Sequence, residues 1–311
     1  MIKEFKKHLS LIFKKIFKRI FEEKIHKELT LKAKILSFKN KSLKSIKDLS
    51  EVEFQVYSQW GEDGIIDWLI NKFPEISKSF LEIGTENYKE SNTRFLLSNN
   101  NWNGFLIEAD KAAVKDIKSQ RIFWKHNLRV ENEFITKDNI NEIVKKINVP
   151  KKLGLLSLDI DGVDYWILNN LSFLEPSIVV CEYNSLFGQK KSVTVPYKKN
   201  FIRSEEHYSN LYYGASIKAF IDMMKKKNYF FIGTNSAGNN AFFIEKKLWN
   251  KARKFIIEKK VFVSKFRESR NAKGKLNFLD KKKCLEVIKN KHMIDLKDNR
   301  KKRIHELKLF N

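Results

Sequence analysis

The sequence predicts an α/β protein built around a doubly wound, mostly parallel sheet. Three observations support this. Between residues 54 and 226, short apolar runs of β character alternate with segments of helical spacing, which is typical of repeated βαβ units. Three of the runs, 104–108, 153–159 and 177–182, end in an acidic residue. Two later runs, 229–234 and 240–245, flank a short polar turn and predict a hairpin that adds an antiparallel strand.

Local patterns predict each element in chain order. Apolar residues at spacings of three and four predict helices, and compact apolar runs predict strands. We expect helices at 62–72, 91–99, 111–119, 139–147, 163–171 and 215–226. We expect the earlier strands at 80–84, 104–108, 153–159 and 177–182, with one more inside 121–130. The polar segment 185–212 is expected to be a long loop.

Charge divides the chain into three predicted parts. Residues 1–50 contain 15 Lys or Arg and 5 acids, and residues 251–311 contain 21 and 7, whereas 51–250 is nearly neutral. We therefore expect a central domain between two basic helical extensions. In residues 2–25 an apolar helical face lies opposite Lys and Arg. That pattern fits contact with an anionic membrane surface, or packing on the body or on a second subunit. No nucleic-acid-binding motif is present, so nucleic acid is not an expected partner.

The location expected from the sequence is cytoplasmic, with peripheral contact at the inner membrane face. The chain has two cysteines, Cys181 and Cys284, and no disulfide framework or metal-binding CxxC pair. It contains no run of 18 apolar residues that would predict a spanning helix.

Two strand ends predict a nucleoside-type ligand. Glu82 and Gly84 belong to FLEIGTEN, where a strand enters a polar turn and Gly84 would let a ligand approach the backbone. Glu108 ends the next strand, 24 residues after Gly84, where a carboxylate can accept hydrogen bonds from ribose hydroxyls. An ordinary strand-to-helix turn would give the first pattern as well.

A second group of polar residues follows two later strands. Because the carboxyl ends of neighbouring parallel strands share one edge, these residues should converge: Asp159, Asp161, Asp164, Glu182 and Asn184. The string LLSLDIDGVDYW is compatible with three sites. These are a haloacid-dehalogenase-like nucleophile, a DxD pair that binds a metal–nucleotide-sugar complex, and the fourth-strand rim of a methyltransferase. The first is disfavoured, because the motif comes late in the domain and no later acidic pair follows a strand. Some of these acids could also cap the following helix.

The order of these motifs resembles the FkbM-like branch of class I S-adenosylmethionine-dependent methyltransferases over residues 54–246. The strings that carry the resemblance are YSQWGEDG (57–64), FLEIGTENYKESNTRFL (80–96), WNGFLIEAD (102–110), LLSLDIDGVDYWIL (155–168), IVVCEYN (178–184), VPY (195–197), YYGASIKA (212–219) and GNNAFFI (238–244).

The resemblance implies a Rossmann-like sheet of seven strands whose last strand is antiparallel, and S-adenosylmethionine as the cofactor. It assigns Glu82, Gly84 and Glu108 to the cofactor, and it places Asp159, Asp161 and Gly162 where methyl donor and acceptor meet. Thr85, Glu86 and Asn87 depart from the family's small-residue loop.

We therefore predict a methyltransferase that acts on an oxygen of a sugar or glycan precursor. The expected bases are Asp161, Glu182 and His207, in that order, and Asn184, Tyr213 and Ser216 are expected to orient acceptor hydroxyls. We expect no metal, since no ligand cluster has a recognisable spacing. Two alternatives remain: a metal-dependent glycosyl- or phosphoryl-handling enzyme using Asp159 and Asp161, and a non-catalytic Rossmann-like module.

Overall fold

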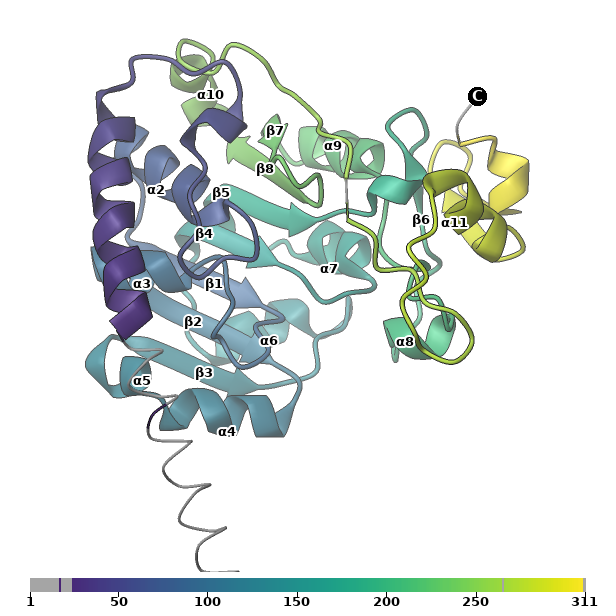
Figure 1. The fold of residues 1–311 in the computed structure, drawn as a ribbon, viewed down its shortest axis with the longest axis horizontal. Helices are drawn as coiled ribbons and strands as arrows, with labels where there is room; N and C mark the ends of the chain where they lie inside the picture. The colour runs from purple at the N-terminus through teal and green to yellow at the C-terminus, as the bar shows by residue number, and fades with distance from the viewer. Residues whose placement is uncertain (1–16, 18–23, 265, 310–311) are drawn as a thin grey trace, which may run out of the picture.

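The computed structural model describes residue 17, residues 24–264 and residues 266–309. Its centre is a seven-stranded sheet in the order β3-β2-β1-β4-β5-β8-β7 (Figure 1). The strands are β1 (Ser79–Ile83), β2 (Asn103–Glu108), β3 (Leu128–Asn132), β4 (Lys152–Leu158), β5 (Glu175–Glu182), β7 (Tyr229–Thr234) and β8 (Asn240–Glu245). Strands β1 to β5 pair in parallel, and β8 is antiparallel to both β5 and β7. The predicted mostly parallel sheet with an antiparallel last strand is confirmed.

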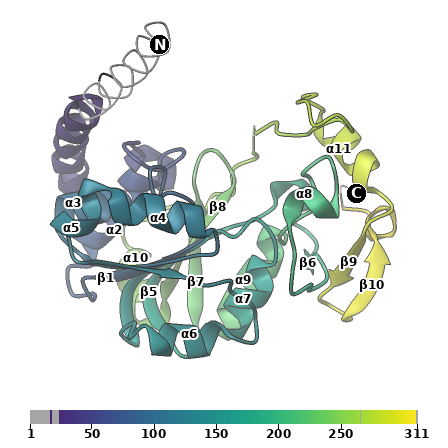
Figure 2. The same cartoon turned by 90° about the horizontal axis from the view of Figure 1, so that it is seen from below.

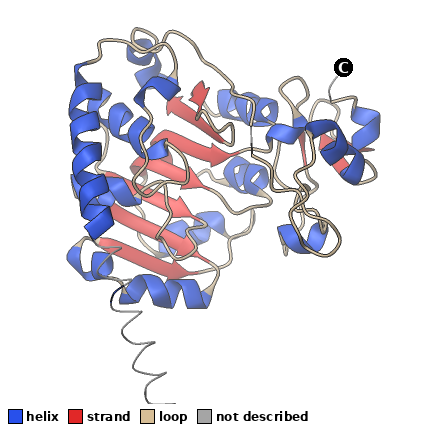
Figure 3. Cartoon of the chain, in the orientation of Figure 1, coloured by secondary structure: helices blue, strands red, loops and turns tan. Residues whose placement is uncertain are grey.

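Helices cover both faces of this sheet (Figures 2 and 3). Successive strand residues point to opposite faces, so Leu155 and Ile178 belong to one core, and Leu156 and Val179 to the other. The first core also contains side chains of η1 (Leu49–Val52), α2 (Glu62–Lys72), α3 (Arg94–Asn100), α4 (Lys111–Ser119), α5 (Arg121–Lys125) and α10 (Lys246–Ala252). The second contains side chains of α6 (Ile140–Lys146), α7 (Asp164–Asn170) and α9 (Ile217–Lys226). Burial on both faces explains why the strands are apolar runs.

Two predicted segments differ from the structure. The apolar run after Arg121 forms the short helix α5, and strand β3 comes later than expected. The loop predicted at 185–212 contains η2 (Ser185–Phe187), the short strand β6 (Val193–Thr194) and α8 (Arg203–Glu206). These pieces are too short for periodicity to reveal.

The N-terminal part is helical over residues 24–42. Ile46 and Leu49 are buried in the core, and Ile46 bridges to Ile256. The body therefore includes residues before position 51, where we expected it to begin. The predicted amphipathic helix at 2–25 lies almost entirely outside the described residues.

The C-terminal extension is only partly helical. It contains α11 (Lys281–Ile288), β9 (His292–Asp295), β10 (Arg300–Arg303) and η3 (Ile304–Leu307). Strand β9 pairs with β10 and with β6, which makes a small second sheet. Figure 1 shows that this sheet and α8 lie beyond the carboxyl edge of the large sheet. None of the helices that the structure describes is long and apolar enough to cross a membrane.

Candidate active site

A cavity of about 400 Å³ lies at the carboxyl ends of the central strands. The strand order reverses between β1 and β4, and open α/β sheets bind ligands at such a reversal. The volume lies in the range of about 300–1,000 Å³ that is usual for small-molecule sites. Its walls come from the loops after β1 to β5, from residues 199–203 and 239–240, and from Phe266 and Glu268.

Gly84 brings two of these loops into contact. Its φ is +79°, and a Cβ added there would lie 1.6 Å from the carbonyl oxygen of Asp159. The sequence suggested that this glycine admits a ligand to the backbone. In the structure the free space is filled by the β4 loop, so Gly84 acts through the packing of one strand end on the other.

Glu108 lies beside this loop at the end of β2. One carboxylate oxygen accepts hydrogen bonds from the backbone N–H groups of Thr85 (2.9 Å) and Glu86 (2.7 Å). The other accepts from the N–H of Asp110 (2.8 Å). A carboxylate has about four lone-pair positions, so a position remains for a ligand in the cavity that Glu108 lines.

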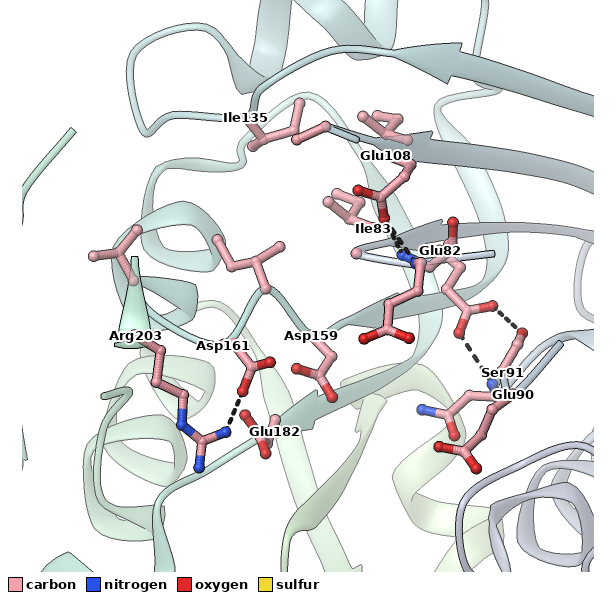
Figure 4. A pocket seen from close by; sticks show the side chains of 18 of the residues that line it. Glu82, Ile83, Glu90, Ser91, Glu108, Ile135, Asp159, Asp161, Glu182 and Arg203 are labelled. Carbon is pink, nitrogen blue, oxygen red and sulfur yellow. Dashed lines mark hydrogen bonds and ion pairs between the residues drawn. The ribbon is translucent and has the colours of Figure 1, made fainter. Parts of the chain in front are cut away.

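Glu82 also lines the cavity, but its carboxylate is already occupied. It accepts a hydrogen bond from the hydroxyl of Ser91 (Figure 4). It also accepts from the hydroxyl of Thr93 and from the backbone N–H of Asn92. Burial raises the pKa of Glu82. Its main contribution is therefore to fix the segment that leads into α3.

The acids after β4 and β5 come together as predicted. Asp159, Asp161 and Glu182 each offer an oxygen within 4.8 Å of the other two (Figure 4). Asp161 is in the left-handed conformation, with φ +55°. Asp164 supports this turn, because its carboxylate accepts from the N–H groups of Ile160 (2.8 Å) and Gly162 (3.0 Å). Asp164 therefore holds the turn that precedes α7, and it does not cap the helix, whose N-cap is Val163 without a side-chain hydrogen bond.

Burial and mutual repulsion change the pKa values of these carboxyl groups. Loss of solvent raises the pKa of Asp159 and of Glu182 well above the usual range, and repulsion from neighbouring carboxyls adds to the effect. Burial also raises the pKa of Asp164, to about 6, although its backbone donors oppose the shift. These buried carboxyls therefore keep their protons to higher pH than exposed carboxyls do.

Arg203 is a site residue that sequence reasoning missed. Its guanidinium donates to Asp161 and to Glu268, and its central carbon lies 3.6 Å from the ring centre of Tyr213. Arg203 comes from a segment predicted to be loop, and Glu268 from the C-terminal extension. No local pattern marks either residue, because only tertiary contact brings them to the cavity.

Four of the residues predicted as bases or as groups that orient the acceptor are not among those that line the cavity, and three of the four are held by structural contacts. The Asn184 side chain caps η2 and donates to the carbonyls of Leu211 and Tyr213, while Ser216 caps α9. Tyr213 is buried beneath Arg203. These three side chains therefore support the walls of the cavity from behind and do not line it, contrary to the expectation that they orient acceptor hydroxyls.

His207 is the fourth. Its Nδ1 forms a 2.7 Å hydrogen bond with the hydroxyl of Ser209, and partial burial and Lys291 lower the pKa of His207. It lies beyond the cavity, so the structure does not support it as a base.

No protein-family model matches this sequence, and comparison with curated proteins finds no relative. Some solved structures are similar. The N-terminal domain of EvdMO1 with SAH bound is 9% identical, with a TM-score of 0.39 over 70% of this chain and 94% of that one. The O-methyltransferase from Bacillus cereus in complex with SAH is 12% identical, with a TM-score of 0.36 over 59% and 79%. The pyocyanin biosynthetic protein PhzM is 11% identical, with a TM-score of 0.36 over 57% of this chain and about half (53%) of its own. TM-scores this low support no conclusion about function. The function proposed below therefore depends on the strand order and the cavity of this chain itself.

Proposed function

We propose that this protein is a class I S-adenosylmethionine-dependent methyltransferase that methylates an oxygen of a sugar or glycan precursor. One observation carries the proposal: the Gly84 turn, the Glu108 carboxylate and the acids after β4 and β5 surround one cavity at the reversal of strand order.

The residues present fit the nucleoside part of the cofactor. Glu108 retains capacity to accept from ribose hydroxyls, and the apolar side chains of Ile107, Phe134 and Ile135 line the adjoining wall for an adenine ring. The hydroxyl oxygen of Thr85 is shielded from solvent and has no hydrogen-bond partner. A buried polar atom without a partner is costly, and a ligand in this cavity would supply one.

The acids after β4 and β5 fit the transfer step. The bound cofactor supplies an electrophilic methyl group on a sulfonium. Asp161 and Glu182, which line the cavity, would orient an acceptor hydroxyl and take its proton as the oxygen–carbon bond forms. Arg203 pairs with Asp161 through its guanidinium.

The side of the cavity beyond the acid cluster has the composition expected for binding a polar, ring-shaped acceptor. Phe201 and Phe266 supply aromatic surface, and Lys199, Arg203 and Glu268 supply charged groups on the same side of the cavity. These aromatic side chains could stack on a sugar ring, and the charged groups could form hydrogen bonds with its hydroxyls. A glycan precursor is therefore our proposed acceptor class.

Isothermal titration calorimetry with S-adenosylmethionine, S-adenosylhomocysteine and nucleotide sugars tests the proposal. We expect the full chain to bind S-adenosylhomocysteine, and Glu108→Gln to weaken binding at least tenfold. Hydrogen bonds to charged groups contribute about 1.5–3 kcal/mol, which supports that expectation. Glu142→Gln, on the exposed surface of α6, should bind as the unmodified chain does. Binding of nucleotide sugars alone would favour the glycosyl-transferring alternative, and binding of neither would favour the non-catalytic module.

A further inference from the structure

Three carboxylates from two adjacent strand ends face one point of the cavity. Asp159 and Asp161 follow β4, and Glu182 ends β5, with an oxygen of each within 4.8 Å of the others. Figure 4 shows the three side chains converging, with Arg203 reaching only Asp161. Their arrangement brings three carboxyl groups into one partly buried place.

The spacing suits a hard divalent cation. Octahedral Mg²⁺ with oxygens at 2.0–2.1 Å separates neighbouring ligand oxygens by about 2.9 Å and opposite ones by about 4.1 Å. Larger cations reach about 5 Å between opposite oxygens. The three oxygens lie within 4.8 Å of one another, so they fit a larger cation directly and must approach by less than about 1 Å to bind Mg²⁺.

Unpartnered oxygens on the same wall are an independent observation. Asn240 lies opposite Glu182 in the β5–β8 register and lines the same cavity, with only 4% of its surface exposed. Its Nδ2 donates to Glu62 (2.8 Å), which fixes the amide orientation, and its Oδ1 has no partner. Glu182 Oε2 is also shielded and unpartnered. Both atoms are oxygens that accept hydrogen bonds or bind cations. A cation or an N–H donor in the cavity would therefore satisfy them.

Arg203, the guanidinium of which contacts this cluster, does not supply that cation. Arg203 divides its guanidinium between Asp161 and Glu268, so its single charge faces at least two carboxylates. Asp164, buried beneath the same turn, adds another acid. A monovalent ammonium would offset the charge of one ionised carboxylate, whereas a divalent cation would offset two.

We propose that Asp159, Asp161 and Glu182 bind a divalent cation of the Mg²⁺ or Mn²⁺ class, with Asn240 Oδ1 as a further oxygen ligand. The sequence predicted no metal, because Glu182 and Asn240 reach the Asp159 pair only through the pairing of β4, β5 and β8. If the proposed function holds, the cation would also bind the acceptor oxygen and promote loss of its proton. Cation binding itself does not depend on that function.

Titration of the full chain with Mn²⁺, followed by electron paramagnetic resonance without any cofactor, tests the site. We expect one saturable Mn²⁺ per chain, competed by Mg²⁺. Asp161→Asn should weaken binding at least tenfold, and Asn tolerates the left-handed backbone at this position. Glu182→Gln provides a second, independent variant, and Glu142→Gln is the matched control that should bind normally. Circular dichroism and melting curves verify that each variant is folded.

The outcomes separate this inference from the proposed function. Saturable Mn²⁺ binding that both site variants weaken supports the cation site, even if S-adenosylhomocysteine does not bind. The absence of saturable binding would overturn it, and so would equal affinity in folded Asp161→Asn and Glu182→Gln. If S-adenosylhomocysteine binds and Mn²⁺ does not, the acids instead face an organic cation, and the metal proposal is wrong while the methyltransferase proposal stands.

Discussion

Replacing Gly84 by alanine tests the contact on which the cavity depends. The added Cβ would lie 1.6 Å from the Asp159 carbonyl oxygen, less than half of an ordinary carbon–oxygen contact of about 3.4 Å. One strand end must therefore shift by more than an ångström. Overpacking of this kind costs about 1–3 kcal/mol, and a left-handed alanine adds about 1 kcal/mol. We expect Gly84→Ala to lower the free energy of unfolding by about 2–4 kcal/mol.

Gly274 offers a matched control in the same chain. Its φ is +73°, close to that of Gly84, but an added Cβ would meet no atom within 4 Å. Gly274→Ala should therefore cost only the backbone strain of about 1 kcal/mol. The difference between the two variants isolates the contact with Asp159.

Differential scanning calorimetry and urea unfolding measure both variants. At about 2–4 °C per kcal/mol for a chain of this size, Gly84→Ala should lower Tm by about 4–16 °C. Calorimetry should also show loss of S-adenosylhomocysteine binding, because the shift displaces Asp159 in the cavity wall. If Gly84→Ala unfolds within 0.5 kcal/mol of Gly274→Ala, the two strand ends do not touch as described and our reasoning is refuted.

Two further predictions concern pH and membranes. Burial raises the pKa of Asp63 to about 7, so the folded state holds a proton that the unfolded state loses near pH 4. The free energy of unfolding should fall as pH rises from about 4 to about 7. Asp63→Asn should make that slope shallower by up to about 1.4 kcal/mol per pH unit, and equal slopes in urea titrations would contradict this. We also propose that the N-terminal extension at residues 1–50 binds an anionic membrane surface through the amphipathic stretch 2–25. Deleting residues 1–23, which leaves the buried Ile46 and Leu49 in place, should abolish sedimentation with anionic vesicles at low salt while S-adenosylhomocysteine binding persists. Vesicle binding by the shortened chain would refute the proposal.

Local structure was largely predictable from the sequence. Helices α2 and α4 and strands β7 and β8 have the bounds that we predicted, because apolar periodicity and turn residues are encoded within a few positions. The short helix α5 was missed, since an aromatic-rich run such as IFW fits a strand equally well. The predicted start of the body at residue 51 is too late, because burial of Ile46 depends on a partner more than 200 residues away.

The sequence by itself determined which residues end the strands, and so it identified Glu108, Asp159, Asp161 and Glu182 as candidates. Only the tertiary structure decided which of them share a cavity, because strand order depends on hydrogen bonds between segments that are distant along the chain. It also brought Arg203 and Asn240 to the same wall and left His207 outside. Side-chain type is a local property, whereas convergence on one point is a consequence of packing.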